Sequence, residues 1–256
     1  MNIDLSGRVA LVTGASGELG RVISRTLARC GADVAIHYLR NRDKACQVQE
    51  EIQPLGRRAM VVQADITDGP SIQAMQQAVS QSLGQPDIIV NCAVIQYDWK
   101  PVLEQSVEDY EGQFRSCVLQ NVLMAKAFVP AMIAKRWGRV IAINTECAMQ
   151  NTSPQSAYVA GKRGMDGVLR VLAREIGEHQ ITVNQVAPGW MISEKYRQDA
   201  NLHEQYDKVY RQGVPLRRRG QDQDIANAVA FLASDLASFI TGAYLPVCGG
   251  NIMPAI

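Results

Sequence analysis

Short runs of apolar residues alternate along this chain with longer segments that carry the periodicity of amphipathic helices. The apolar runs lie at residues 8–13, 33–38, 59–63, 87–91, 139–144, 181–187 and 243–247. Helical patterns lie between them, at 18–30, 44–55, 71–83, 107–135, 156–178, 193–212 and 224–234. A strand that is apolar on both faces is buried on both faces. The pattern therefore predicts an α/β fold, with a doubly wound, seven-stranded, mostly parallel sheet and helices on both of its faces.

No repeat, low-complexity tract or linker divides this pattern, and 256 residues suit one large α/β domain. We therefore expect a single domain over residues 1–256. A polar segment with a helical pattern, at about 190–215, follows the sixth strand. It is either a lid over a site or an ordinary surface helix.

Charge and cysteine content narrow the class of protein. A formal net charge of +1 argues against a surface for nucleic acid or for an anionic membrane. The six cysteines show neither a CxxC pair nor metal-ligand spacing, so we expect free thiols in a reducing compartment and no metal site. The N-terminus lacks the pattern of a signal peptide, and no stretch is apolar for long enough to span a bilayer. These features predict a cytoplasmic protein.

The first strand runs directly into a glycine-rich turn, Gly14-Ala15-Ser16-Gly17-Glu18-Leu19-Gly20, and a helix follows. Glycines in such a turn let the backbone approach a pyrophosphate, and the helix N-terminus offers free N–H groups and a partial positive charge. The alternative is a turn that needs glycine only for its own conformation. Because strand, turn and helix occur in this order, we interpret the segment as the dinucleotide-binding turn of a Rossmann domain.

The end of the second strand bears on which dinucleotide is bound. NAD sites hold the ribose with an acid near this point, whereas here the strand ends at His37-Tyr38-Leu39, and Arg40 and Arg42 follow. A guanidinium suits a 2′-phosphate, so the sequence favours NADP and leaves NAD open. The arginines could instead be an exposed loop face, and Glu18 would be unfavourable near phosphates unless it faces solvent.

Tyr158 and Lys162 are four residues apart in a helical pattern, so they share one face of the helix. An ammonium beside a phenol favours the phenolate and lowers the pKa of the tyrosine, which could then exchange a proton with an alcohol or a carbonyl. Alone, the pair could be a packed tyrosine and a solvated lysine. The glycine turn and the upstream hydroxyl of Thr145 favour the catalytic interpretation.

In this combination the segments resemble the short-chain dehydrogenase/reductase family over nearly the whole chain, with the 3-oxoacyl-carrier-protein reductase-like branch nearest in pattern. The resemblance rests on residues 13–20, Asp65-Ile66, Asn91-Cys92-Ala93, Thr145 with Tyr158-x-x-x-Lys162, Asn184 with Pro188-Gly189, and Ile240-Thr241-Gly242. It implies an NAD(P)-dependent oxidoreductase that interconverts a small-molecule carbonyl and a secondary alcohol by hydride transfer. It also implies a homo-oligomer, a tetramer or dimer, built by pairing the helices near 107–135 and 156–178.

The resemblance also implies a role for each matching position. Tyr158 would give or take the proton at the substrate oxygen, Lys162 would depress the pKa of that tyrosine and hydrogen-bond the nicotinamide ribose, and Thr145 would steady the substrate oxygen in place of the usual serine. The residues that would bind the cofactor are Gly14, Ser16, Gly17, Leu19, Gly20, Tyr38, Arg40, Asp65, Ile66, Asn91, Ala93, Tyr158, Lys162, Pro188, Gly189 and Ser193.

The chain departs from the family pattern in three places. The glycine spacing of the first turn is shifted by Glu18, and Val94 replaces a glycine after the fourth strand. Cys117 falls where the family has a helix asparagine that holds a water of the proton relay, and a thiol is a poor partner for that water. Gln120 or Asn121 could substitute from a neighbouring turn. The alternative function is therefore a nucleotide-binding protein with weak or no catalysis, although Cys117 could equally be a small core side chain.

The sequence leaves the identity of the substrate open. Tyr97 and Trp99, in the loop after the fourth strand, could line a pocket or only pack that loop. Glu146 and Gln150 follow the fifth strand, whereas Trp190 follows the sixth, which predicts one polar and one apolar wall. Such a pocket would suit sugars, keto acids and acyl thioesters alike.

Overall fold

Seven strands form one sheet in the computed structural model, in the order β3-β2-β1-β4-β5-β6-β7, and all neighbouring strands are parallel. The structure describes residues 2–151, 153–192 and 200–253. The strands are β1 (Val9–Val12), β2 (Asp33–Tyr38), β3 (Ala59–Gln63), β4 (Ile88–Asn91), β5 (Gly138–Ile143), β6 (Ile181–Pro188) and β7 (Tyr244–Val247). The predicted doubly wound sheet is thus confirmed, and its strand positions agree with the apolar runs.

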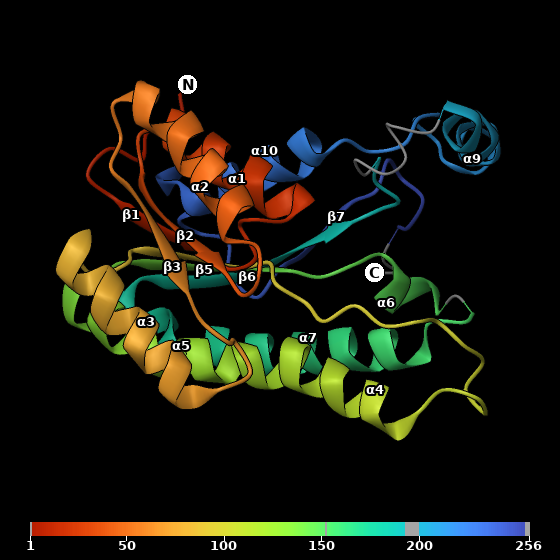
Figure 1. Ribbon diagram of the computed structural model, residues 1–256, viewed down its shortest axis with the longest axis horizontal. Coiled ribbons are helices and arrows are strands. Elements are labelled where there is room, and N and C mark those ends of the chain that lie inside the picture. The colour runs from red at the N-terminus through yellow and green to blue at the C-terminus, as the bar shows by residue number, and fades with distance from the viewer. Residues whose placement is uncertain (1, 152, 193–199, 254–256) are drawn as a thin grey trace.

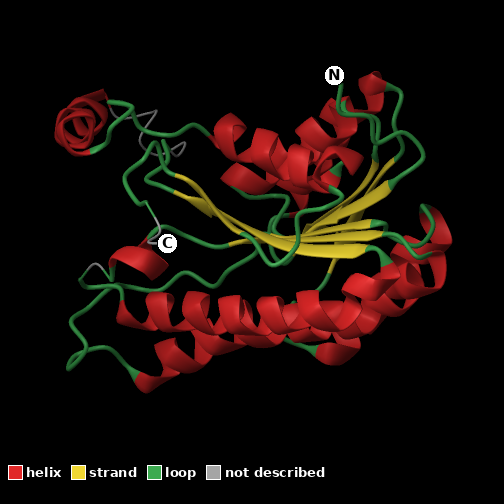
Figure 2. Ribbon diagram, turned by 180° about the vertical axis from the view of Figure 1, so that it is seen from behind, coloured by secondary structure: helices red, strands yellow, loops and turns green. Residues whose placement is uncertain are grey.

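Helices cover the sheet from both sides (Figures 1 and 2). On one side lie α1 (Glu18–Arg29), α2 (Arg42–Ile52) and α10 (Asp222–Ala233); on the other lie α3 (Gly69–Ser82), α4 (Val107–Gln113), α5 (Gln120–Lys135) and α7 (Ser156–Ile176). Two further helices are α6 (Cys147–Gln150) and α9 (Ala200–Gly213), and short 3-10 turns lie at Gln53–Leu55, Gly177–His179 and Asp235–Ala237. Residues 193–199 of the expected lid lie outside the described residues.

Each face of the sheet has its own apolar core, because successive strand residues point to opposite faces. Along β2, Val34, Ile36 and Tyr38 belong to the core beneath α1, α2 and α10, whereas Ala35 belongs to the core beneath α3, α5 and α7. Both cores are fully buried at their centres, as the apolar runs predict.

The stretch at 107–135 is not one regular helix. A π-helical segment, Phe114–Leu119, interrupts it between α4 and α5, and Cys117 lies within this segment. Val107–Lys135 is also long and apolar enough to cross a membrane by length and composition, so the expectation that no stretch reaches this threshold was wrong. Here 44% of its most apolar window is buried inside the protein. A helix that packs against the sheet and two neighbouring helices is apolar over most of its surface.

The strand order reverses at β1, because the chain passes from β1 to β2 and β3 on one side and then returns to β4 on the other. In a doubly wound sheet, the carboxyl ends of the strands at such a reversal form a crevice in which ligands bind. The glycine turn follows β1 and the Asn91-Cys92-Ala93 turn follows β4, so both predicted motifs lie at this crevice.

Candidate active site

Two adjoining cavities lie at the carboxyl edge of the sheet. One, of about 660 Å³, follows the glycine turn, and the other, of about 520 Å³, surrounds Tyr158. Ile95 and Gln96 line both cavities, so the cavities adjoin at the loop after β4. We call the first the cofactor cleft and the second the substrate cavity.

Hydrogen bonds from backbone N–H groups to a side-chain hydroxyl join the turns after β1 and β4. The Thr13 hydroxyl accepts the N–H groups of Cys92 at 2.9 Å and Ala93 at 3.1 Å. Gly14 has a φ of +67°, and a Cβ at Gly20 would lie 2.3 Å from the Gly14 carbonyl oxygen. Only glycine fits at these two positions, and the result is a backbone cradle that a pyrophosphate can approach closely.

Most of the residues predicted to bind the cofactor gather in this cleft. It is lined by Gly14, Ser16, Gly17, Leu19, Gly20, Arg40, Asp65, Ile66 and Ala93, together with Glu18, His37, Leu39, Asn41, Thr67 and Val94. Glu18, whose charge weighed against phosphate binding, pairs with Arg21 at 3.3 Å. That contact neutralises part of its charge at the entrance of the cleft.

The cleft lining does not include the other seven predicted residues, which are Tyr38, Asn91, Tyr158, Lys162, Pro188, Gly189 and Ser193. Tyr38 is buried in the core beneath α1 and α2 instead of lining the cleft, because the alternation of β2 turns it away from the side that its neighbours His37 and Leu39 present. Asn91 is buried below the cleft, where its amide donates to Asn121 at 2.7 Å. Gly189, which follows the last β6 residue Pro188, lines the substrate cavity. Ser193 lies outside the described residues.

His37 is a residue of the cleft that the sequence did not single out for a role. Its Nδ1 accepts the N–H of Gly14 at 3.0 Å, and its Nε2 lies 3.0 Å from the carbonyl oxygen of Ala64. Burial lowers the pKa of His37, so the ring is neutral, with Nε2 as the donor. The imidazole therefore ties the glycine turn to the ends of β2 and β3.

Two of the three predicted catalytic residues, Thr145 and Tyr158, line the substrate cavity, and the third, Lys162, is buried beside the Tyr158 ring. The Thr145 hydroxyl is close enough to the Tyr158 phenol to lower its pKa. Lys162, which is 4% exposed, places Nζ 5.7 Å from the centre of the Tyr158 ring and donates to the carbonyl oxygen of Ile143 at 2.5 Å. The ammonium and the phenol are thus on the same side of α7, as their spacing predicts.

The electrostatic expectation for Tyr158 needs a correction. Burial raises the pKa of Tyr158, the nearby Thr145 hydroxyl lowers it, and nearby thiols raise it further. Lys162 does not outweigh this desolvation, because its ammonium faces the ring and a backbone carbonyl. In this structure Tyr158 is a protonated phenol at neutral pH, ready to donate.

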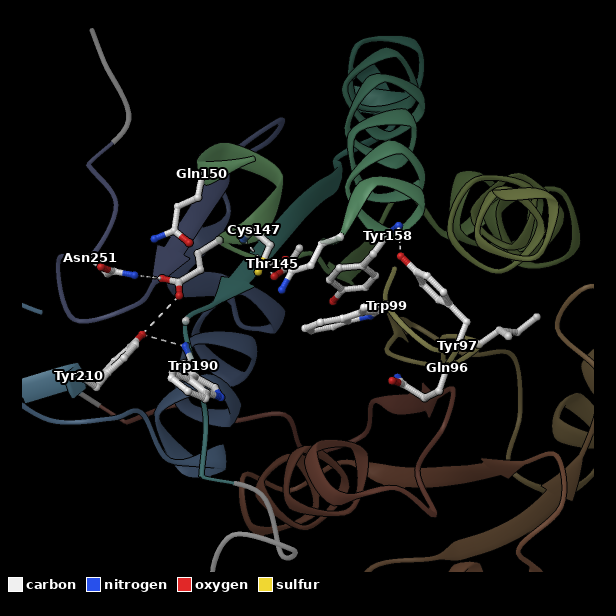
Figure 3. A pocket seen from close by; sticks show the side chains of 14 residues that line it. Gln96, Tyr97, Trp99, Thr145, Cys147, Gln150, Tyr158, Trp190, Tyr210 and Asn251 are labelled. Carbon is white, nitrogen blue, oxygen red and sulfur yellow. Dashed lines mark hydrogen bonds between the residues drawn. The ribbon is translucent and has the colours of Figure 1, made fainter. Parts of the chain in front are cut away.

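The loop after β4 supports the catalytic helix and also lines the cavity. The Tyr97 hydroxyl accepts the backbone N–H of Tyr158 at 2.7 Å, which satisfies one free donor of the first turn of α7. The rings of Trp99 and Tyr158 are stacked, 6.4 Å apart at an angle of 25° (Figure 3). Both alternatives for Tyr97 and Trp99 therefore hold, since they pack the loop and line the cavity.

Cys117 is a buried side chain of the π-helical segment, and its thiol lies 3.7 Å from the Gln113 amide oxygen. Neither proposed substitute is directed to Tyr158. Asn121 bonds Asn91 and the Cys117 carbonyl, both at 2.7 Å, and the Gln120 amide lies 3.1 Å from the Thr13 hydroxyl. These amides connect the helix to the strand ends, and the grouping of Thr145, Tyr158 and Lys162 is intact beside them.

A polar wall of the substrate cavity is assembled from distant segments. Glu146 is 5% exposed and accepts hydrogen bonds from the Tyr210 hydroxyl at 3.3 Å and from the Asn251 amide at 3.0 Å (Figure 3). Burial raises the pKa of Glu146, and these donors oppose the shift. Tyr210 also accepts the N–H of Trp190 at 2.8 Å, so the polar wall holds the tryptophan of the apolar wall.

Comparisons with known sequences agree with this geometry. The family model described as enoyl-(acyl carrier protein) reductase matches residues 14–251. The 3-oxoacyl-[acyl-carrier-protein] reductase FabG of Pseudomonas aeruginosa is 36% identical over 251 residues, which cover 98% of this chain and 100% of that protein. The FabG of Staphylococcus epidermidis is 37% identical over 254 residues, covering 95% of this chain and 98% of that protein.

Solved structures of dehydrogenases and reductases are also similar to this chain. A 7α-hydroxysteroid dehydrogenase complexed with NADH and 7-oxo glycochenodeoxycholic acid has a TM-score of 0.89 and 31% identity, with 99% of this chain and 97% of that chain covered. L-Sorbose reductase from Gluconobacter frateurii, complexed with NADPH and L-sorbose, has a TM-score of 0.93 over 100% of both chains at 24% identity, which shows the shared fold. Nothing in these comparisons favours the alternative of a binding protein without catalysis.

Proposed function

Because the chain belongs to the short-chain dehydrogenase/reductase family and is an NAD(P)-dependent oxidoreductase acting on carbonyl and alcohol groups, we propose that Thr145, Tyr158 and Lys162 are its catalytic residues. The observation that carries this proposal is the placement of Thr145 and Tyr158 together on the wall of the substrate cavity, with the Lys162 ammonium 5.7 Å from the centre of the phenol ring. This cavity adjoins the cofactor cleft at Ile95 and Gln96.

The residues of the cleft fit a nicotinamide dinucleotide. The close approach at Gly14 and Gly20 opens the backbone to a pyrophosphate, and Asp65 and Ile66 would flank the adenosine half. Arg40 lines the cleft at the strand end that carries no acid, which supports NADP over NAD. The nicotinamide supplies or accepts the hydride, and the protein holds the substrate and moves the proton.

Proton transfer in the direction of reduction follows from the state of Tyr158. As the carbonyl oxygen of the substrate gains negative charge, the O–H bond of Tyr158 breaks and a new O–H bond forms on that oxygen. Thr145, which lines the same cavity as Tyr158, would hold the substrate oxygen in place. Lys162 would stabilise the phenolate that remains. Oxidation of an alcohol is the reverse of these transfers.

We also propose that residues 1–256 act as one catalytic domain in a cytoplasmic homo-oligomer, a tetramer or dimer. Exposed apolar side chains on α4, the π-helical segment and α7 support the oligomer: Val107 is 67% exposed, Phe114 51% and Val171 56%. Apolar surface gathered on neighbouring helices is typical of a face that pairs with a second copy.

The variant Tyr158→Phe tests the assigned acid. We expect its kcat for NADPH-dependent reduction of ketones to fall by about 10²–10⁴-fold, the usual contribution of a general acid, while NADPH still binds in a fluorescence titration. Tyr110→Phe is a matched control, because that phenol bonds Ser156 at 2.7 Å on the same helix and does not line the cavity. Turnover by Tyr158→Phe at the rate of the control would remove Tyr158 from the mechanism.

A further inference from the structure

The polar wall of the substrate cavity carries hydrogen-bond acceptors that the protein does not use up. We propose that Glu146 and Gln155 are specificity-determining residues that accept hydrogen bonds from hydroxyl groups of the substrate, so that the substrate is a short hydroxylated ketone or the corresponding polyol. This inference rests on the proposed function of the same site.

Gln155 provides the first observation. Its side chain is 8% exposed and lines the substrate cavity directly before α7. The oxygen Oε1 of its amide is buried and has no hydrogen-bond partner among the described residues. A buried carbonyl oxygen without a partner is costly, so a group that donates to it from the cavity would be bound favourably.

Glu146 provides the second observation. A carboxylate has about four acceptor positions, and the Tyr210 hydroxyl and the Asn251 amide approach its two oxygens from one side each. Both of these donors are neutral, and Glu146 is the one residue with a full formal charge among the fourteen described residues that line the cavity. A negative wall of this kind repels carboxylate or phosphate groups on a substrate and attracts donors.

The wall is a built site and not an accident of packing, because three distant segments must meet to form it. A Cβ at Gly189 would lie 2.8 Å from the Tyr210 hydroxyl, so glycine is needed for that phenol to reach Glu146. Gly249 and Gly250 have φ values of +65° and +86°, and they turn the C-terminal segment so that Asn251 meets the carboxylate. Segments around residues 146, 210 and 251 are thereby fixed on one side of Thr145 (Figure 3).

Aromatic rings also line the cavity. Trp99 lies along the ring of Tyr158, and Trp190 packs edge-on against Tyr210 at 5.7 Å, next to the polar wall (Figure 3). These rings present apolar faces to a carbon chain beside the acceptors. A chain with hydroxyl groups beside its carbonyl therefore matches both walls, and a plain hydrocarbon chain would leave the acceptors unpaired.

A matched set of four-carbon ketones tests this assignment with purified protein and NADPH. The set comprises erythrulose, butan-2-one, 4-aminobutan-2-one and an acetoacetyl thioester. We expect kcat/KM for erythrulose to exceed that for butan-2-one by at least about 10²-fold, because sites built to hydrogen-bond a hydroxyl discriminate strongly against analogues without it. Glu146→Gln and Gln155→Leu should each lower this ratio by about tenfold or more, mainly through kcat/KM for erythrulose.

The outcomes separate the two proposals. Glu178→Gln, a change at a carboxylate whose side chain is 79% exposed, controls for loss of charge alone and should leave the ratio unchanged. A preference for butan-2-one, the amino ketone or the thioester, or a ratio unaffected by both variants, would overturn the assignment of hydroxyl groups while leaving the reductase function intact. If none of the four ketones is reduced, the proposed function fails and this inference fails with it.

Discussion

Replacement of His37 should weaken the fold and the cofactor cleft together. The imidazole is 1% exposed, accepts the N–H of Gly14 at 3.0 Å and contacts the Ala64 carbonyl oxygen at 3.0 Å. In His37→Phe an aromatic ring still fills the volume, but both backbone groups lose their partner. In His37→Asn the amide oxygen can still accept from Gly14, so only the bond to Ala64 is lost.

The expected cost follows from these two contacts. A buried polar group without a partner costs about 1–3 kcal/mol, so His37→Phe should lower the free energy of unfolding by about 2–6 kcal/mol and His37→Asn by about half as much. Domains are stable by about 5–15 kcal/mol, so the first variant would lose a large share of its stability. Because Gly14 belongs to the phosphate cradle, the affinity for NADPH should fall in the same order.

The wild-type contact should also depend on pH. Burial lowers the pKa of His37 in the folded protein, and the nearby Asp65 carboxylate opposes this shift. The unfolded chain takes up the proton near the ordinary histidine pKa of about 6.5, whereas the folded chain resists it. The stabilisation is therefore complete above about pH 6.5 and decreases as the pH falls, by up to about 1.4 kcal/mol per pH unit.

Urea denaturation at pH 7.5, 6.5 and 5.5 measures both effects, and NADPH fluorescence titrations at pH 7.5 measure the cleft. The difference in stability between the wild type and His37→Asn should shrink as the pH falls from 6.5 to 5.5. His179→Asn is the control, because His179 lies in a surface turn with a side chain that is 28% exposed. The described role of His37 is wrong if His37→Phe and His179→Asn have the same free energy of unfolding. It is also wrong if the difference in this free energy between the wild type and His37→Asn is the same at pH 5.5 as at pH 6.5.

Three further changes give separate expectations. Arg40→Glu should weaken NADPH binding by about 10–100-fold with little effect on NADH binding, since a charge-assisted contact to phosphate is lost. Fluorescence titrations measure the ratio of the two dissociation constants, and an unchanged ratio would exclude Arg40 from the 2′-phosphate site. Tyr97→Phe leaves the Tyr158 N–H without its acceptor and should cost about 1 kcal/mol and several-fold in kcat, whereas wild-type melting and rate would contradict this. Val171→Glu places a charge on the exposed face of α7 and should dissociate the proposed oligomer, so light scattering that shows an unchanged mass would argue against that face.

The sequence predicted the fold well because a sheet covered on both faces leaves a simple signature. A strand such as β2 coincides with its apolar run, since nearly all of its residues are buried in one core or the other. The face of the sheet to which each strand residue points was harder to predict from the sequence. Tyr38 was expected in the cofactor cleft, but alternation along β2 places it in the core and places His37 against the glycine turn.

Other features depend on contacts that no local pattern carries. The π-helical segment, Phe114–Leu119, contains no proline or glycine that would mark the change of helix type, and α6 spans only Cys147–Gln150, which is too short for a periodic signal. The polar wall joins Glu146 to partners 64 and 105 residues later in the chain. The spacing of Tyr158 and Lys162 did predict that their side chains lie on one face of α7, because four residues along one helix fix two side chains without help from the rest of the fold.

The raised pKa of Tyr158 changes what Lys162 has to do. If the lysine made the phenol acidic before the reaction, it would stabilise the ground state, and a phenolate would have no proton to give to a carbonyl. In the structure burial keeps the Tyr158 phenol protonated, and the Lys162 ammonium lies 5.7 Å from the centre of its ring. Its charge then acts mainly as the proton leaves and the phenolate forms, and an interaction that strengthens in the transition state raises kcat. The same arrangement favours carbonyl reduction at neutral pH and requires a more alkaline pH for oxidation of the alcohol, where Tyr158 must begin as the base.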